Sequence, residues 1–240
     1  APRSSRFSLI AIVLILVAFV GAYVSAGYSH TLSGLLQKQR EFNELFGAMD
    51  IEDPSQVAIV AVSPTASDLP PWMDPERVWI YRVQIPANYA VAWSENEGLI
   101  AADSPLRRGN NGGSYSYQGS EAPKEVRIVI TTNIEDGRLK GTMLTNSGSL
   151  SFSLPKEMAL ASPDDLILDE VVKPGDPMRT FAVDEAICVW RIRSKKPSKK
   201  MRNHTQLYPG CAIYLYETSR RDAFERWANG KASSMGKSTL

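Results

Sequence analysis

Ser153 and Lys156 match a short motif that could support covalent chemistry. In penicillin-binding enzymes an S-x-x-K pair places a serine nucleophile and a lysine on one face of a helix. Here Pro155 lies between the two residues, and proline does not fit a helix interior. The S-D-N and K-T-G motifs that accompany the pair in those enzymes are also missing from the sequence. We therefore interpret the match as coincidental.

Other catalytic and metal-binding patterns are missing as well. No G-x-S-x-G sequence is present, and a serine–histidine–aspartate triad would need His204, which lies in a basic, polar stretch. Asp164–Asp165 and Asp169–Glu170 lack the alternating spacing of a calcium loop, and the first pair is typical of a turn or helix cap. The glycines form neither a phosphate-binding loop nor a dinucleotide fingerprint. The sequence thus predicts no catalytic, metal-binding or cofactor-binding residue, and a protein that is not an enzyme.

A cluster of basic residues near the C-terminal third could recognise an anionic partner. Lipid headgroups, a cell-wall polymer or an acidic protein face are the candidates. The alternative is a solvated loop between the last two strands, which Pro197 and the neighbouring serines favour. The cluster consists of Arg191, Arg193, Lys195, Lys196, Lys199, Lys200 and Arg202.

Cys188 and Cys211 are too few for a disulfide scaffold or a cysteine-based zinc site. If residues 187–193 and 210–216 pair as a hairpin with Arg193 opposite Gly210, the two sulfurs lie about 13 Å out of register. In that register Cys188 faces Leu215. A longer loop would bring Cys188 opposite Cys211, so a disulfide outside the cytoplasm stays open.

Composition excludes a general nucleic-acid binder, because 27 Lys and Arg residues nearly balance 26 Asp and Glu residues. Aromatic residues in loops rich in glycine or proline suggest a second kind of partner. Trp72, Tyr115 and Tyr117 could stack on sugar rings, or they could pack on the edge of a domain.

The segment from Phe7 to Ala26 carries no charge and would span roughly 30 Å as a helix, which matches the hydrocarbon core of a bilayer. Arg3 and Arg6 precede it, and this predicts a cytoplasmic N-terminus at 1–6 and a transmembrane helix at 7–28. Cleavage after Ala26 as a signal peptide is one alternative. A pilin-like leader ending before Phe7 is another.

Helical spacing continues beyond this segment and predicts a juxtamembrane helical stalk at 29–50. Such a helix could form a short coiled coil with a second copy of the chain, giving a homo-dimer. It could equally fold back on its own domain.

From residue 51 the pattern changes to strands, bounded by prolines and turn residues. Asp136-Gly137 predicts a type I′ hairpin turn, and 107–118 is expected to be a flexible surface loop. We predict a mainly β domain at 51–218, an all-β sandwich or jelly-roll-like fold, followed by a short helix at 219–230 and a disordered tail at 231–240. Strands are expected at 56–62, 77–85, 89–93, 125–132, 138–144, 149–154, 186–193 and 211–216.

Three features together resemble a group of uncharacterised bacterial single-pass membrane proteins with a short stalk and a β-rich domain. They are Arg6-Phe7-Ser8-Leu9 at the start of the span, the polar stalk, and the strand from Trp79 to Pro86, which fits W-x-x-R-V-x-[LI]-P. In that group Pro209-Gly210 would likewise precede a final aromatic strand, here Cys211 to Glu217. The resemblance implies an anchored β domain and carries over no functional residue.

The expected protein is a single-pass, inner-membrane protein with an extracytoplasmic β domain. It is expected to bind a protein or an envelope component without catalysis and without a cofactor. A membrane-tethered hydrolase of envelope glycans is the first alternative, and it requires two carboxylates converging in a cleft. A pilin-like assembly subunit is the second.

Overall fold

The computed structural model describes Tyr28, Met49 and residues 51–64, 75–108, 113–146, 148–154 and 163–235. The chain divides into two compact units, Ala1–Asp50 and Ile51–Leu240. The predicted membrane-spanning helix at 7–28 and the stalk at 29–50 lie outside the described residues, apart from Tyr28 and Met49. Within the described part of the chain, no helix combines the length and apolarity needed to cross a bilayer.

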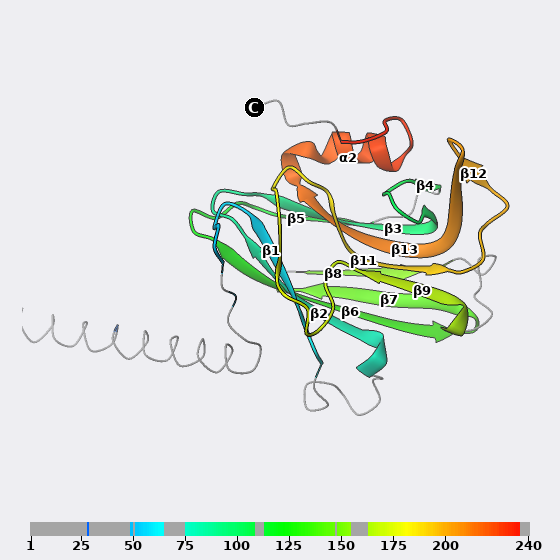
Figure 1. Cartoon of the computed structure of the whole chain (residues 1–240), viewed down its shortest axis with the longest axis horizontal. Coiled ribbons are helices and arrows are strands. Elements are labelled where there is room, and N and C mark those ends of the chain that lie inside the picture. The colour runs from blue at the N-terminus through cyan, green and yellow to red at the C-terminus, as the bar shows by residue number, and fades with distance from the viewer. Residues whose placement is uncertain are drawn as a thin grey trace, which may run out of the picture. The chain divides into compact units, whose positions relative to one another are not determined.

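The second unit contains two antiparallel sheets that lie face to face (Figure 1). The first, called sheet A, has six strands. In spatial order they are β10 (Arg179–Phe181), β1 (Val57–Val62), β2 (Val78–Ile85), β6 (Lys124–Glu135), β7 (Arg138–Thr145) and β8 (Gly148–Ser153).

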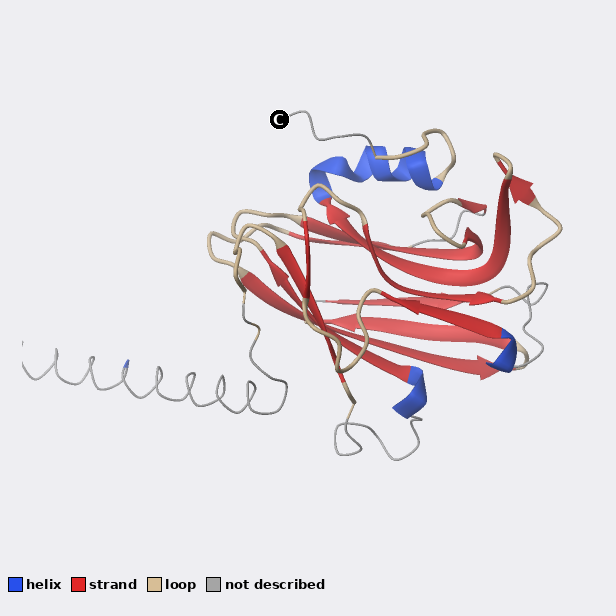
Figure 2. Ribbon diagram, in the orientation of Figure 1, coloured by secondary structure: helices blue, strands red, loops and turns tan. Residues whose placement is uncertain are grey.

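The second sheet, called sheet B, has seven strands. Its main path runs β4 (Arg107–Arg108), β3 (Val91–Ala101), β13 (Thr205–Glu217), β11 (Ile187–Ser194) and β9 (Leu166–Glu170). Two short strands lie beside this path, β5 (Ser114–Tyr117) on β3 and β12 (Met201–Arg202) on β13. Strands dominate the described residues, as predicted (Figure 2).

Alternation along the strands explains why the two sheets pack together. In β6, Val126, Ile128 and Ile130 are buried while the residues between them are partly exposed, so one face of the strand enters the core. Trp190 of sheet B packs against sheet A, with ring centroids 5.3 Å from Trp79 and 5.9 Å from Phe152. The prediction of a mainly β domain is confirmed, and the arrangement is a sandwich with a shared core.

A single α-helix among the described residues covers the outer face of sheet B. Helix α2 (Arg221–Ala228) follows a 3₁₀ turn at Thr218–Arg220, within the range predicted to be helical. Phe224 is buried, and its ring stacks on Tyr216 at 4.2 Å and lies 5.6 Å from Tyr214. The helix therefore gives sheet B a second, smaller apolar layer.

Turn chemistry fixes the hairpin between β6 and β7. Asp136 and Gly137 both have positive φ, at 51° and 71°, as a type I′ turn requires. Glu135 pairs with Arg138 across this turn, so the predicted hairpin is present.

One loop expectation was wrong, and one strand was not predicted. The stretch 107–118 contains β4 and β5, and both pair with β3 in place of a flexible loop. Asp169 and Glu170 end strand β9, which the sequence pattern did not predict because only five residues form it at a sheet edge. The turn expected at Asp164–Asp165 is present as a 3₁₀ turn at Pro163–Asp165.

The register of sheet A defines two ends of the sandwich. Chain segment 51–57 enters at one end, where β1 begins and the neighbouring strand β2 finishes, because Ala58 pairs with Gln84. At the opposite end Val78 pairs with Thr131, and the β6–β7 turn follows. We call this opposite end the far end, and it lies at the right in Figure 1.

Candidate binding cleft and the polar segment of strand β3

A cleft of about 960 Å³ lies at the far end, along β6, β7 and β8. Most of its lining side chains carry hydroxyl, amide or charged groups of both signs. The lining residues are Arg77, Glu97, Thr131, Thr132, Asn133, Ile134, Glu135, Lys140, Gly141, Thr142, Ser151, Phe152 and Ser153.

Polar side chains of the cleft bond to one another and are thereby held in place. Lys140 Nζ lies 2.5 Å from Glu135 Oε2, and Asn133 Nδ2 donates to Glu135 Oε1 at 3.1 Å. The ammonium group of Lys140 lowers the pKa of the exposed Glu135 carboxyl. The hydroxyls of Thr142 and Ser151 lie 3.5 Å apart. This network presents donors and acceptors at fixed positions.

Gly141 in β7 lines the cleft and leaves room for the ring of Phe152. A Cβ atom at this position would overlap the Phe152 ring and the Thr131 carbonyl oxygen. The pairing of Gly141 with Phe152 in β8 therefore requires glycine.

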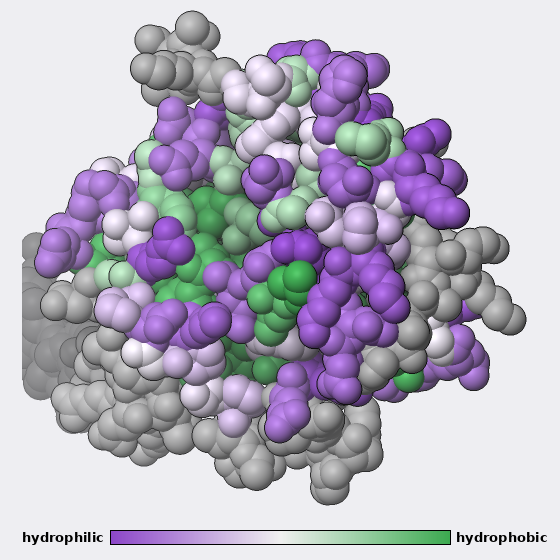
Figure 3. All heavy atoms as spheres, turned by 45° about the vertical axis from the view of Figure 1, so that its right-hand side comes forward, coloured by the Kyte–Doolittle hydropathy of each residue, from purple (hydrophilic) through white to green (hydrophobic). Residues whose placement is uncertain are grey.

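A smaller apolar recess of about 280 Å³ adjoins the cleft and shares Arg77, Thr132 and Ile134 with it. Its wall also contains half-buried Trp79 and five further residues. These are Glu76, Leu139 and, from β9 and β11, the aliphatic residues Leu166, Leu168 and Ile192. Figure 3 shows one face of the molecule, where apolar residues lie in the middle and hydrophilic residues surround them.

Strand β3 carries a polar segment, Ser94-Glu95-Asn96-Glu97, although it pairs with β13 in the interior of sheet B. Ser94, Glu95 and Asn96 are buried, and Glu97 is half-buried. Alternation sends Glu95 and Glu97 to the face shared with Trp93, toward sheet A. Ser94 and Asn96 therefore point to the opposite face, toward helix α2.

The two carboxyl groups on the inner face contact each other and the edge of sheet A. Glu95 forms a side-chain hydrogen bond with Glu97, and Glu97 Oε2 accepts the main-chain N–H of Ser153 at 3.0 Å. Burial, and then the charge of Glu97, raise the pKa of Glu95 to about 8. Glu95 is therefore mostly protonated at neutral pH and can donate to the Glu97 carboxylate.

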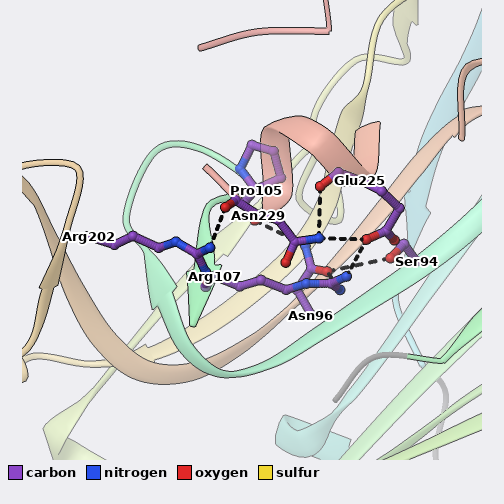
Figure 4. A network of polar contacts seen from close by, with 7 residues as sticks. All are labelled: Ser94, Asn96, Pro105, Arg107, Arg202, Glu225 and Asn229. Atoms are coloured by element: carbon purple, nitrogen blue, oxygen red, sulfur yellow. Dashed lines mark hydrogen bonds and ion pairs between the residues drawn. The ribbon is translucent and has the colours of Figure 1, made fainter. Parts of the chain in front are cut away.

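The outer face of the polar segment docks helix α2 (Figure 4). Buried Arg107 donates to Asn96 Oδ1 and, at 2.7 Å, to Glu225 Oε2 of the helix. Asn229 Nδ2 donates to the same carboxylate at 3.1 Å, and Arg202 donates to the main-chain oxygens of Arg107 and Asn229. These bonds join the strand, the β12 hairpin and the helix, which is a structural role.

The residues of the basic cluster do not share one exposed surface. Arg191 is buried and donates to Ala102 O and Tyr214 Oη, while Arg193 lies 3.6 Å from Asp169. Arg202 belongs to the helix-docking network. Exposed lysines remain in the loop between β11 and β12, namely Lys195, Lys196, Lys199 and Lys200. Arginines thus stabilise the fold, and only the lysines are placed to meet a partner.

Both cysteines are free thiols. Arg193 pairs with Gly210 as expected, but a bulge at Val189 shifts the register, so Cys188 pairs with Tyr214 and not with Leu215. Cys211 pairs with Ile192 and belongs to the core between the sheets, whereas Cys188 packs on the side of helix α2. The two sulfurs therefore lie on opposite faces of sheet B. Burial raises the pKa of both thiols.

Other residues singled out from the sequence have structural positions. Tyr115 and Tyr117 pack edge to face at 5.3 Å, and Tyr117 is buried, so they pack on the domain edge and do not line the cleft. His204 lies in the tight turn before β13 with a φ of 62°. Ser153 is in a strand, and Trp72 and Lys156 lie outside the described residues.

Sequence reasoning missed the polar segment because it ended the strand at Trp93. A signal was available, since Ser94-Glu95-Asn96-Glu97 lies between the apolar residues Trp93 and Leu99 without a proline or a turn. In the described ranges, no group of three or more His, Cys, Asp or Glu residues is arranged to hold a metal ion.

Comparisons with known proteins found no match: no family model, no curated protein and no solved structure resembles the chain at a significant level.

Proposed function

We propose that this protein is a membrane-anchored, non-catalytic binding protein whose far-end cleft takes a glycan of the cell envelope. In this proposal residues 7–28 form a single transmembrane helix with the N-terminus in the cytoplasm. Residues 29–50 form the stalk, and the β domain lies outside the cytoplasm.

The observation that carries the proposal is the lining of the cleft. Five hydroxyl side chains, those of Thr131, Thr132, Thr142, Ser151 and Ser153, lie there with Asn133 and with charges of both signs. Hydroxyl and amide groups both donate and accept, so they complement a ligand that itself carries many hydroxyl groups. The adjoining recess adds the indole of Trp79, which can meet the apolar face of a sugar ring.

Position in the domain supports the same reading. The chain enters sheet A at the β1 end, and the cleft lies at the other end, beyond the twelve-residue strand β6. Such a strand is about 40 Å long. A domain tethered through residue 51 can therefore present the cleft away from its point of attachment.

The carboxyl pair favours binding over glycan hydrolysis. Glycosidases hold two carboxyl groups about 5–10 Å apart on either side of the bond they cleave. Glu95 and Glu97 instead bond to each other, and Glu95 is 3% exposed, which leaves no room for a sugar between them. Their contacts fit a role in fixing the cleft margin.

Co-sedimentation of the full chain, purified in mild detergent, with insoluble envelope glycan would test this function. Thr142→Val and Ser151→Ala each remove a hydroxyl from the cleft and should lower the retained fraction severalfold. Ser149→Ala is the matched control, because Ser149 lies in the same exposed strand but does not line the cleft. Wild-type protein that stays in solution, or an equal loss in Ser149→Ala, would overturn the proposal. Recovery of a protein partner by crosslinking, with no glycan retained, would do the same.

A further inference from the structure

We propose that Glu95 and Glu97 share a proton that fastens the edge strand β8 to strand β3, and that loss of this proton loosens the wall of the cleft. This inference concerns regulation of the cleft and rests on the proposed function only for its effect on ligand binding.

The contacts form a continuous chain from one sheet to the other. Protonated Glu95 donates to Glu97, and Glu97 Oε2 accepts the Ser153 N–H at 3.0 Å. Ser153 is the last residue of β8, which pairs with β7 and forms one edge of sheet A in the described part of the chain. Glu97 thus satisfies an edge amide that points away from β7, and it does so from the other sheet.

Glu97 and Ser153, which this hydrogen bond joins, also belong to the cleft wall. Glu97, Ser151, Phe152 and Ser153 all line the cleft, so any movement of the β8 edge against β3 changes its shape. Hydroxyls that we assign to ligand binding lie on this strand. A change at the carboxyl pair would therefore reach the ligand site directly.

Burial and the charge of Glu97 favour the protonated form of Glu95 over the effect of two neighbouring donors. Cys211 of β13 lies 3.9 Å from Glu95 Oε1, and burial of this thiol keeps it neutral. Glu97 adds a negative charge from the same strand, which raises the pKa of Glu95 further. The Cys211 thiol and the Gly113 amide donate to Glu95 and stabilise its ionised form, so they only partly offset burial and the Glu97 charge. Leu150 of β8 packs near Gly113 and is apolar. Ionisation of Glu95 would place two negative charges in contact inside the sandwich, which repel each other.

Amide hydrogen exchange of the full chain, measured by mass spectrometry without any ligand, tests whether the proton shared by Glu95 and Glu97 fastens β8 to β3. We call this contact the carboxyl latch. After correction for the intrinsic pH dependence of exchange, wild-type peptides covering 148–154 should exchange about tenfold faster at pH 9.5 than at pH 6.5. Glu95→Gln and Glu97→Gln should each abolish this rise, because repulsion needs two carboxylates. Glu121→Gln, at an exposed loop glutamate, should behave as wild type.

Two outcomes separate this inference from the proposed function. If the exchange rate of 148–154 in the wild type does not rise with pH, or rises equally in the wild type and all three variants, the carboxyl latch is overturned. Glycan binding is then unaffected by this result. A rise that depends on both glutamates, in a protein that retains no glycan, supports the carboxyl latch and overturns the proposed function. Either glutamine variant can serve if the other does not fold, since Glu97 is half-buried and tolerates the change more readily.

Discussion

Glu97 in sheet B accepts the main-chain N–H of Ser153 in sheet A at 3.0 Å, so a side chain of one sheet completes the hydrogen bonding of an edge strand in the other. Unpaired edge groups are places where strands associate with other chains. The bond joins the two sheets at the margin of the cleft, beside the buried residue Glu95. Several measurable consequences follow from this and from the other polar contacts.

Stability should depend on pH through Glu95. Its pKa is raised to about 8 in the folded protein, against an ordinary value of 4.5, so the folded state binds more protons between these values. The contribution is fully present below pH 4.5 and is lost as pH rises through about 8, on the order of 5 kcal/mol in total. Glu95→Gln should remove this loss. In urea unfolding, the unfolding free energy of the wild type should therefore fall relative to that of the variant between pH 5 and pH 9. The same difference between the two proteins at both pH values would contradict the assignment.

Loss of Arg107 should undock helix α2. Arg107→Ala would leave Asn96 and Glu225 without a strong donor, at a cost of about 2 kcal/mol because Glu225 is partly solvated. Amide hydrogen exchange of peptides covering Arg221–Ala228 reports on the helix, and chemical unfolding reports on the domain. Arg107→Lys keeps the charge but reaches only one partner, so it should fall between the wild type and the alanine variant. An alanine variant as stable as the wild type would show that the network contributes nothing.

A methyl group at residue 141 should not be accommodated. Gly141→Ala would force apart β7 and Phe152, and we expect a loss of about 2 kcal/mol or more in unfolding free energy. Gly175→Ala provides the comparison, because Gly175 has a φ of 88° and open space around it. Strain alone should cost this variant about 1 kcal/mol. Equal denaturation midpoints for the two variants would mean that β7 and β8 can move apart enough to accommodate the methyl group.

The lysine loop should bind anionic surfaces, and the arginines should not matter for this. In co-sedimentation with vesicles rich in phosphatidylglycerol, Lys196→Glu with Lys199→Glu should weaken retention, and salt should weaken that of the wild type. Lys173→Glu with Lys231→Glu makes the same charge change elsewhere on the surface. Identical retention of the two double variants would remove the loop as a contact site.

Topology can be tested apart from the ligand. A reporter enzyme that is active only outside the cytoplasm, fused after Leu240, should be active in intact cells if residues 7–28 span the membrane as proposed. Replacing Val13 and Leu16 by arginine should abolish both activity and membrane retention. Activity that persists in a released, shorter protein would indicate cleavage after Ala26.

Local patterns predicted the sheets better than the site. The strands predicted at 77–85 and 125–132 and the Asp136-Gly137 turn depend on adjacent residues, and they correspond to β2, β6 and the turn between β6 and β7. The bulge at Val189 could not be foreseen, because it depends on packing both Val189 and Trp190 into the core. A buried Ser94-Glu95-Asn96-Glu97 segment contradicts simple hydrophobic patterning. Only its partners, from residues as distant as Ser153 and Glu225, explain it.

Pairing between β3 and β13 has a consequence for how the chain must fold. Eleven residue pairs connect Val91–Ala101 with Thr205–Glu217, so the centre of sheet B is completed by the last strand of the described residues. Contacts between such distant segments form slowly, since a long loop must first be ordered. Sheet B therefore cannot be completed during synthesis until residue 217 has emerged. Truncation before residue 205 should leave an open sheet with exposed edges that is prone to aggregate.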